Sequence, residues 1–203
     1  MNKKIVSLVC LIAVITCVSV TVLLLSDGKE PEKENKITDA IKFSQEYKKV
    51  PEKNVFVYRS AAEIVKILEN GTGVVFMGFA ECPWCQAYAP ILNEVAMDIG
   101  VEKIFYCDIR KDRADNTAAY KKIVSLLEEH LDYDDEGKPR VFVPEVAVVV
   151  DGEIVGHDNE TSLISDPSLT PDMYWTEEQK SRLVTKLEEM IIPLASTICS
   201  QCE

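Results

Sequence analysis

The sequence predicts an α/β fold with a mixed central sheet and helices on both of its faces. Short apolar runs that are typical of buried strands alternate with amphipathic helical patterns, which favours parallel strands joined by helical crossovers. The last two strand patterns are separated only by Asp151-Gly152, a strong hairpin signal, so they should pair antiparallel. A Cys-x-x-Cys pair, Cys82 and Cys85, falls between the second strand pattern and the helix that follows it.

Four regions of different composition divide the chain. They are residues 1–26, a membrane anchor or signal segment; residues 27–53, a charged linker with a short N-terminal extension; residues 54–192, the α/β domain; and residues 193–203, a tail with a second Cys-x-x-Cys pair. In the extension, Ile37, Ile41 and Tyr47 are spaced for a short amphipathic helix.

The N-terminal segment is predicted to be a single transmembrane helix. Ile5–Leu25 has no charged residue, and at about 1.5 Å per residue it can span a hydrocarbon core of about 30 Å. Lys3 and Lys4 precede it, which favours a cytoplasmic N-terminus and an extracytoplasmic domain. A cleaved signal peptide, giving a secreted protein, is one alternative, although no A-x-A-type site precedes Ser26. Lipid modification of Cys17 is another.

The first half of the domain is predicted to contain three strands and two helices. Ser60 with Glu63 three residues later is a capping-box pattern, which indicates a helix start. Gly73–Phe79 is an apolar run typical of a central, buried strand. The elements are strand Asn54–Tyr58, a helix from Ser60 to Asn70, strand Gly73–Phe79, helix Pro83–Ile99 with a kink at Pro90, and strand Lys103–Ile109.

The second half is predicted to end in a hairpin and a helix. Its elements are helix Ala114–Leu131, the acidic loop Asp132–Lys138, strands Glu145–Val150 and Glu153–Gly156, a long loop His157–Thr176, and helix Glu177–Ile192. Loops of this length are usually functional or mobile. Cys107, within a strand pattern, is expected to be a buried, inert thiol, and His157 a surface residue.

Charge excludes some classes of partner. The formal net charge is −12, and it becomes −14 without Lys3 and Lys4 of the N-terminal segment. An acidic domain does not suit nucleic acid or anionic lipid, so we expect neither as a ligand.

The Cys82–Cys85 pair has the features of a redox switch. A thiol at a helix N-terminus faces unpaired backbone N–H groups and the positive end of the helix dipole. Both favour the thiolate, which is the reactive form of cysteine. Cys85 lies one turn further along the same face, within reach for a disulfide.

Residues Phe79–Ala96 resemble the active-site strand and helix of thioredoxins, in which a proline also follows the second cysteine by five residues. Val143-Pro144, followed by an apolar strand and a glycine hairpin, resembles the cis-proline segment of that family. The resemblance covers about Asn54–Ile192, and within the superfamily it extends to membrane-anchored bacterial proteins, including the bacteriocin-transport accessory type. It implies a thioredoxin-like fold and a thiol–disulfide oxidoreductase that needs no cofactor or metal.

The resemblance also assigns roles. Cys82 is the nucleophile, and Cys85 resolves the mixed disulfide. Pro144, if cis, leaves the backbone of Val143 free to pair with an extended substrate; the alternative is an ordinary strand entry. Trp84 is expected at the exposed helix start, either as an apolar contact surface for substrates or as a cover for the disulfide.

Three departures from thioredoxins leave the redox direction open. Phe76 stands where that family carries a buried Asp, and Tyr106 stands where it carries a lysine. Glu81 and Glu145 are candidates to replace the missing proton relay of Cys85. The dipeptide between the cysteines is Pro-Trp rather than Gly-Pro, and tens of millivolts decide whether such a pair oxidises or reduces.

The C-terminal pair, Cys199 and Cys202, has three possible roles. The pair would relay electrons to or from Cys82 and Cys85, or form a local or regulatory disulfide. The third alternative is a four-thiolate zinc site that the pair forms together with Cys82 and Cys85.

We therefore expect a membrane-tethered, extracytoplasmic oxidoreductase that exchanges disulfides with exported proteins. Its partners would be protein thiols and disulfides and a membrane electron-transfer partner. The alternative is a thioredoxin-like adaptor or metal-binding module of an export or bacteriocin system, without redox turnover.

Overall fold

The computed structural model describes residues 38–164, 166 and 168–200, without the side chains of residues 162, 163 and 195–200. The predicted span Ile5–Leu25 therefore lies outside the described residues, as do Cys202 and the side chain of Cys199. No helix in the described part of the chain has the length and hydropathy that a bilayer crossing requires.

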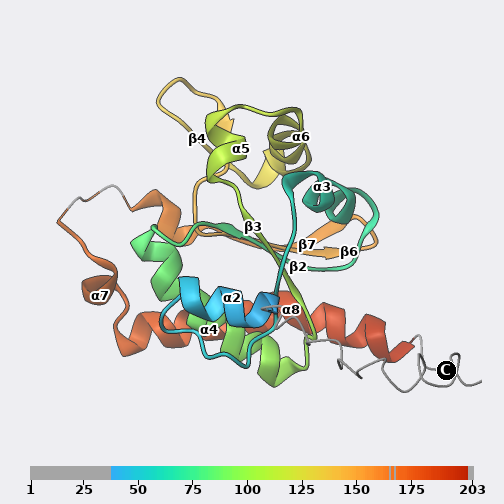
Figure 1. Cartoon of the computed structure of the whole chain (residues 1–203), viewed down its shortest axis with the longest axis vertical. Coiled ribbons are helices and arrows are strands. Elements are labelled where there is room, and N and C mark those ends of the chain that lie inside the picture. Colours follow the sequence, from blue (N-terminus) through green and yellow to red (C-terminus); the bar gives the residue numbers. More distant parts are fainter. Residues whose placement is uncertain (1–37, 165, 167, 201–203) are drawn as a thin grey trace, which may run out of the picture. The chain divides into compact units, whose positions relative to one another are not determined.

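A five-stranded mixed sheet forms the centre of the domain (Figure 1). Its order is β1-β3-β2-β6-β7, with β1, β3 and β2 mutually parallel and β6 and β7 antiparallel. The strands are β1 Phe56–Tyr58, β2 Gly73–Gly78, β3 Ile104–Asp108, β6 Glu145–Val150 and β7 Glu153–Asp158. The predicted mixed sheet, its central apolar strand and its terminal hairpin are confirmed. At the hairpin turn Asp151 has φ 49° and Gly152 φ 82°, the left-handed values that such turns require.

Helices cover both faces of this sheet, as predicted (Figure 1). Helices α3 and α6 pack on one face, and α2, α4 and α8 pack on the other. The helices are α2 Asp39–Glu46, α3 Ala61–Asn70, α4 Pro83–Ile99, α5 Arg110–Ala114, α6 Ala118–Leu127, α7 Pro171–Tyr174 and α8 Glu177–Ser200, with 3-10 turns at Glu128–His130 and Glu160–Leu163.

Helix starts and ends follow the predicted capping chemistry. Ser60 accepts the N–H of Glu63, and the Glu63 side chain accepts the N–H of Ser60, which completes the capping box. Helix α4 starts at Pro83, continues through Pro90 and ends at Gly100, whose φ of 90° is a left-handed cap.

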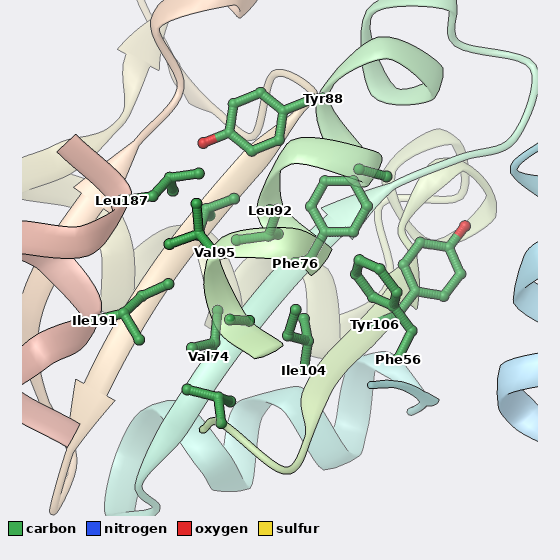
Figure 2. Packing of buried hydrophobic residues seen from close by; sticks show 14 of the residues in the cluster. Phe56, Val74, Phe76, Tyr88, Leu92, Val95, Ile104, Tyr106, Leu187 and Ile191 are labelled. Atoms are coloured by element: carbon green, nitrogen blue, oxygen red, sulfur yellow. The ribbon is translucent and has the colours of Figure 1, made fainter. Parts of the chain in front are cut away.

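The larger core cluster lies between the sheet and helices α2, α4 and α8. Figure 2 shows aromatic side chains from three strands gathered with apolar side chains of α4 and α8. Phe76 of β2 stacks on Tyr88 of α4, with ring centroids 6.3 Å apart. This packing fixes α4 against the strand that precedes it, so the helix start is held at the end of β2.

Helix α2 belongs to this core, although its sequence suggested only an extension before the domain. Thr38 caps it, and its aromatic side chains Phe43 and Tyr47 are fully buried. Phe43 stacks on both Tyr47 and Phe56, with centroids 4.2 and 3.8 Å apart. The segment therefore contributes directly to the packing behind β1 and β3.

The second cluster lies between the sheet and helices α3 and α6. Cys107 of β3 is buried within it, and burial raises the pKa of this thiol to about 12. The expectation that this thiol is buried is confirmed, and its raised pKa disfavours the reactive thiolate.

Several elements differ from their predicted bounds, and the largest differences lie in the second half of the domain and at its end. The predicted helix 114–131 is divided into α5 and α6, because Asn116 takes φ 47° and Thr117 caps α6 by accepting the N–H of Tyr120 at 3.2 Å. The acidic loop forms a small hairpin, β4 Asp132–Tyr133 with β5 Pro139–Arg140. Helix α8 runs on to Ser200, so residues 193–200, predicted as tail, are helical in their backbone.

Candidate functional site

The two cysteines lie where the central strand passes into helix α4. Cys82 is the N-cap of the helix, and its Sγ accepts the backbone N–H of Cys85 at 3.3 Å. A sulfur atom thus takes the place of the oxygen that usually caps a helix. Cys82 retains 7% of its surface exposed, whereas Cys85 has none. Of the pair, only Cys82 reaches the surface.

The surroundings of Cys82 favour its thiolate. Its pKa is lowered to about 7, first by a hydrogen bond from the Cys85 thiol and then by the backbone N–H groups of Cys85 and Trp84. The positive charge of Arg113 adds to this effect, while partial burial opposes it. Cys82 is therefore ionised to a much larger extent near neutral pH than an ordinary cysteine.

Cys85 has the opposite character. Burial raises its pKa well above the ordinary thiol value, and the neighbouring Cys82 thiolate raises it further. Both thiols are free in this structure. The arrangement separates one reactive thiolate from one protected thiol, the asymmetry that two-step disulfide exchange uses.

The segment before β6 lies against this pair. The Val143–Pro144 peptide bond is cis, and the carbonyl oxygen of Val143 is 4.0 Å from Sγ of Cys82. Val143 is half-buried and Pro144 is buried. The fold therefore brings together Cys82, Val143 and Pro144, residues that sequence analysis had selected from distant parts of the chain.

Trp84 is half-buried rather than at a fully exposed helix start. The ring of Tyr174 in α7 packs edge to face against the Trp84 ring, with ring centroids 5.6 Å apart. The ring centroid of Trp175 lies 4.9 Å from that of Tyr174. The predicted long loop, which contains a 3-10 turn and helix α7, supplies these aromatic partners. Its position next to Trp84 could not be derived from the sequence, because loop and helix are far apart along the chain.

A tyrosine hydroxyl lies behind the buried cysteine. A methyl group added at Gly78 would lie 3.1 Å from Sγ of Cys85 and 3.3 Å from the hydroxyl of Tyr47, so both atoms surround that glycine. Tyr47 donates to the hydroxyl of Tyr106 at 3.2 Å. Phe76 and Tyr106 thus give this region an uncharged, aromatic character, and Tyr47, the C-cap of α2, places its hydroxyl near the same glycine as Sγ of Cys85.

Neither carboxylate proposed as a proton relay faces Cys85. Glu81 is exposed and pairs with Arg110 at 2.7 Å. Glu145 is fully buried, but its sheet neighbour Met77 belongs to the cluster on the opposite face from Cys85. Because paired residues share a face of the sheet, the Glu145 side chain points away from the cysteines.

Glu145 instead pairs with His157, which was expected at the surface. That expectation is wrong, because His157 is largely buried on β7 and stacks on His130 with centroids 5.2 Å apart. Burial raises the pKa of Glu145 to about 7, against the opposing effect of His157.

The predicted C-terminal dithiol lies outside the described side chains, so its three possible roles stay open. Within the described part of the chain, no three His, Cys, Asp or Glu side chains are grouped as a metal site.

No protein-family model fits the chain, and no curated protein is significantly similar to it in sequence. The chemistry of the site is therefore inferred from its own residues and their geometry.

Proposed function

We propose that this protein is a thiol–disulfide oxidoreductase with Cys82 as its nucleophile and Cys85 as its resolving thiol. The observation that carries the proposal is the asymmetry of the pair. Cys82 caps a helix with a pKa of about 7, and Cys85 lies fully buried behind it.

In the reducing direction, the Cys82 thiolate attacks one sulfur of a substrate disulfide. A Cys82–substrate disulfide forms, and the other substrate sulfur leaves as a thiolate that takes up a proton. Cys85 then loses its proton and attacks Sγ of Cys82, which releases the second substrate thiol and closes the Cys82–Cys85 disulfide. Two electrons pass from the protein to the substrate. In the oxidising direction the same steps run in reverse.

The proposal includes a thioredoxin-like fold for the domain. The strand order, the parallel first three strands, the terminal hairpin and the cis bond beside the cysteine pair support it. The resemblance of residues 79–96 to a thioredoxin active-site segment is a second, independent support.

The proposal also concerns location and partners. Residues 1–26 would tether the domain outside the cytoplasmic membrane, or direct it for secretion. Its substrates would then be exported proteins, and a membrane electron-transfer partner would restore the redox state of the pair. The support for this part is the sequence of the N-terminal segment alone.

Insulin reduction tests the proposed activity. The purified full chain, in mild detergent with dithiothreitol as reductant, should accelerate the precipitation of insulin B chains. Cys82→Ser should abolish this acceleration, because the serine hydroxyl is not ionised near neutral pH. Cys107→Ser is the matched control, since it replaces a buried thiol on the other face of the sheet and should leave the rate close to that of the parent chain.

Equal rates for the parent chain and Cys82→Ser would overturn the proposal. They would favour the alternative of a thioredoxin-like adaptor without redox turnover.

A further inference from the structure

A surface cavity of about 420 Å³ is unusually rich in arginine. It is formed by α5, the start of α6 and the β4–β5 hairpin. Four of its lining residues are cationic: Arg110, Arg113, Lys138 and Arg140. Such a cluster stands out on a chain whose formal net charge is −12.

Two arginines of this cavity also contact the segment that carries the proposed nucleophile. The guanidinium groups of Arg110 and Arg113 lie 5.4 and 5.7 Å from the ring centroid of Phe79, three residues before Cys82. Arg113 also donates to the carbonyl oxygen of Val141 at 3.0 Å. Val141 leads directly to Val143, whose carbonyl oxygen faces Cys82. The charge of Arg113 also helps to lower the pKa of Cys82, so this wall of the cavity is near the sulfur that a substrate must reach.

Two of the four cations already have carboxylate partners. Arg110 pairs with Glu81 at 2.7 Å and with Asp108 at 3.4 Å, and Lys138 pairs with Glu136 at 2.7 Å.

The other two, Arg113 and Arg140, have no carboxylate within ion-pair distance among the described side chains. Asp134 also lines the cavity, but its carboxylate accepts the backbone N–H groups of Glu136 and Lys138, at 3.0 Å each. Nε of Arg140 is buried and lacks a hydrogen-bond partner. A buried donor of this kind costs stability unless a ligand satisfies it.

We propose that this cavity binds a carboxylate side chain of the polypeptide substrate, next to the cysteine that reacts with Cys82. The inference rests on the proposed function and adds a substrate class to it: polypeptides in which acidic residues flank the reacting cysteine. Arginine suits this ligand because its planar fork matches both oxygens of a carboxylate. A single carboxylate fits better than a polyanion, because the rest of the chain repels extended negative charge.

Disulfide-bonded model peptides test this substrate preference. Three peptides with the same cysteine would carry Glu, Gln or Lys at the flanking positions, and the full chain would reduce each with dithiothreitol present. We expect kcat/KM for the Glu peptide to exceed that for the Gln peptide by about tenfold, the effect of one charge-assisted hydrogen bond. The Lys peptide should react most slowly. The preference should fall as salt is raised.

Variants then assign the preference to the cavity. Arg140→Gln should reduce the Glu-to-Gln ratio of kcat/KM towards one. Arg182→Gln is the matched control, because Arg182 is an exposed arginine of α8 that pairs with Glu178 away from the cavity. It should keep the parent ratio.

The outcomes separate the two proposals. Equal rates for the three peptides, or a Glu preference that Arg140→Gln leaves intact, would overturn this inference while the exchange activity stands. Failure to reduce any of the peptides or insulin would instead overturn the proposed function.

Discussion

At the scale of single residues, the site depends on what surrounds each sulfur atom. Cys82 and Cys85 are the same residue type three positions apart, yet one has its pKa lowered to about 7 and the other has its pKa raised. A hydrogen bond from the Cys85 thiol and the helix N–H groups act on the first, and burial acts on the second. The sequence predicted the effect of the N–H groups, because the helix start is visible in Pro83 and the apolar run before it.

The pKa of Cys82 gives a direct prediction for the reduced protein. Iodoacetamide should alkylate Cys82 at a rate that rises with pH to a midpoint near 7, because only the thiolate reacts. Cys85→Ala should move the midpoint upward, since it removes the thiol that donates to Cys82.

Cys85→Ser should move that midpoint less, because a serine hydroxyl still donates. A midpoint at or above about 8.5 in the parent chain, the value of a free cysteine, would contradict the account.

At the scale of elements, helix α2 shows what the sequence could not supply. Its few apolar residues and charged flanks suggested an extension of the domain. The fold instead places Phe43 and Tyr47 in the core and brings the Tyr47 hydroxyl to the same glycine as Sγ of Cys85. Contacts between segments so distant in sequence depend on tertiary packing, which local periodicity does not reveal.

Other parts of the structure could be predicted because they depend on local sequence rather than on tertiary packing. The helix caps, the central strand and the hairpin follow from residues next to one another in sequence. The division of helix 114–131 was missed because Thr117, a good N-cap, lies inside an otherwise continuous helical pattern. The pairing of Glu145 with His157 was missed because the facing positions of two strands are set by their register.

The position of Tyr47 predicts a role in resolving the mixed disulfide. Tyr47→Phe keeps the stacked ring but removes a polar hydroxyl from the surroundings of Cys85, so the Cys85 thiolate lies in a less polar environment and its pKa should rise further. Decay of a preformed mixed disulfide at Cys82 should slow by about three- to tenfold, and its pH profile should move upward.

Tyr88→Phe is the matched control, because it removes another buried hydroxyl, one that donates to Asp158 at 2.6 Å. It should leave the rate and the pH profile of resolution unchanged. Equal slowing in both variants would mean that lost stability, rather than the position of Tyr47, causes the effect.

At the scale of the whole molecule, stability should depend on pH through one buried carboxyl group. Glu145 holds its proton in the folded state up to a pKa of about 7, whereas in the unfolded chain it loses it near pH 4.5. The protonated group therefore contributes stability that is complete below pH 4.5 and is lost as pH rises through 7.

Glu145→Gln should remove this loss. The variant should match the parent chain in free energy of unfolding near pH 4.5 and exceed it at pH 8 by on the order of 2–3 kcal/mol. Urea unfolding at several pH values measures the difference. Glu81→Gln, at an exposed carboxylate, is the control and should show a much smaller change with pH. A Glu145→Gln difference that is the same at pH 4.5 and pH 8 would refute the assignment.

The central claim for the molecule is that substrates react at Cys82 and are released by Cys85. Trapping of the mixed disulfide measures this directly. When a disulfide-bonded peptide is added, Cys85→Ser should accumulate a covalent adduct that peptide mapping places on Cys82, because no resolving thiol remains. Cys82→Ser should accumulate none, since Cys85 is fully buried. Adducts on Cys85 in the second variant, or no adduct on Cys82 in the first, would contradict the account.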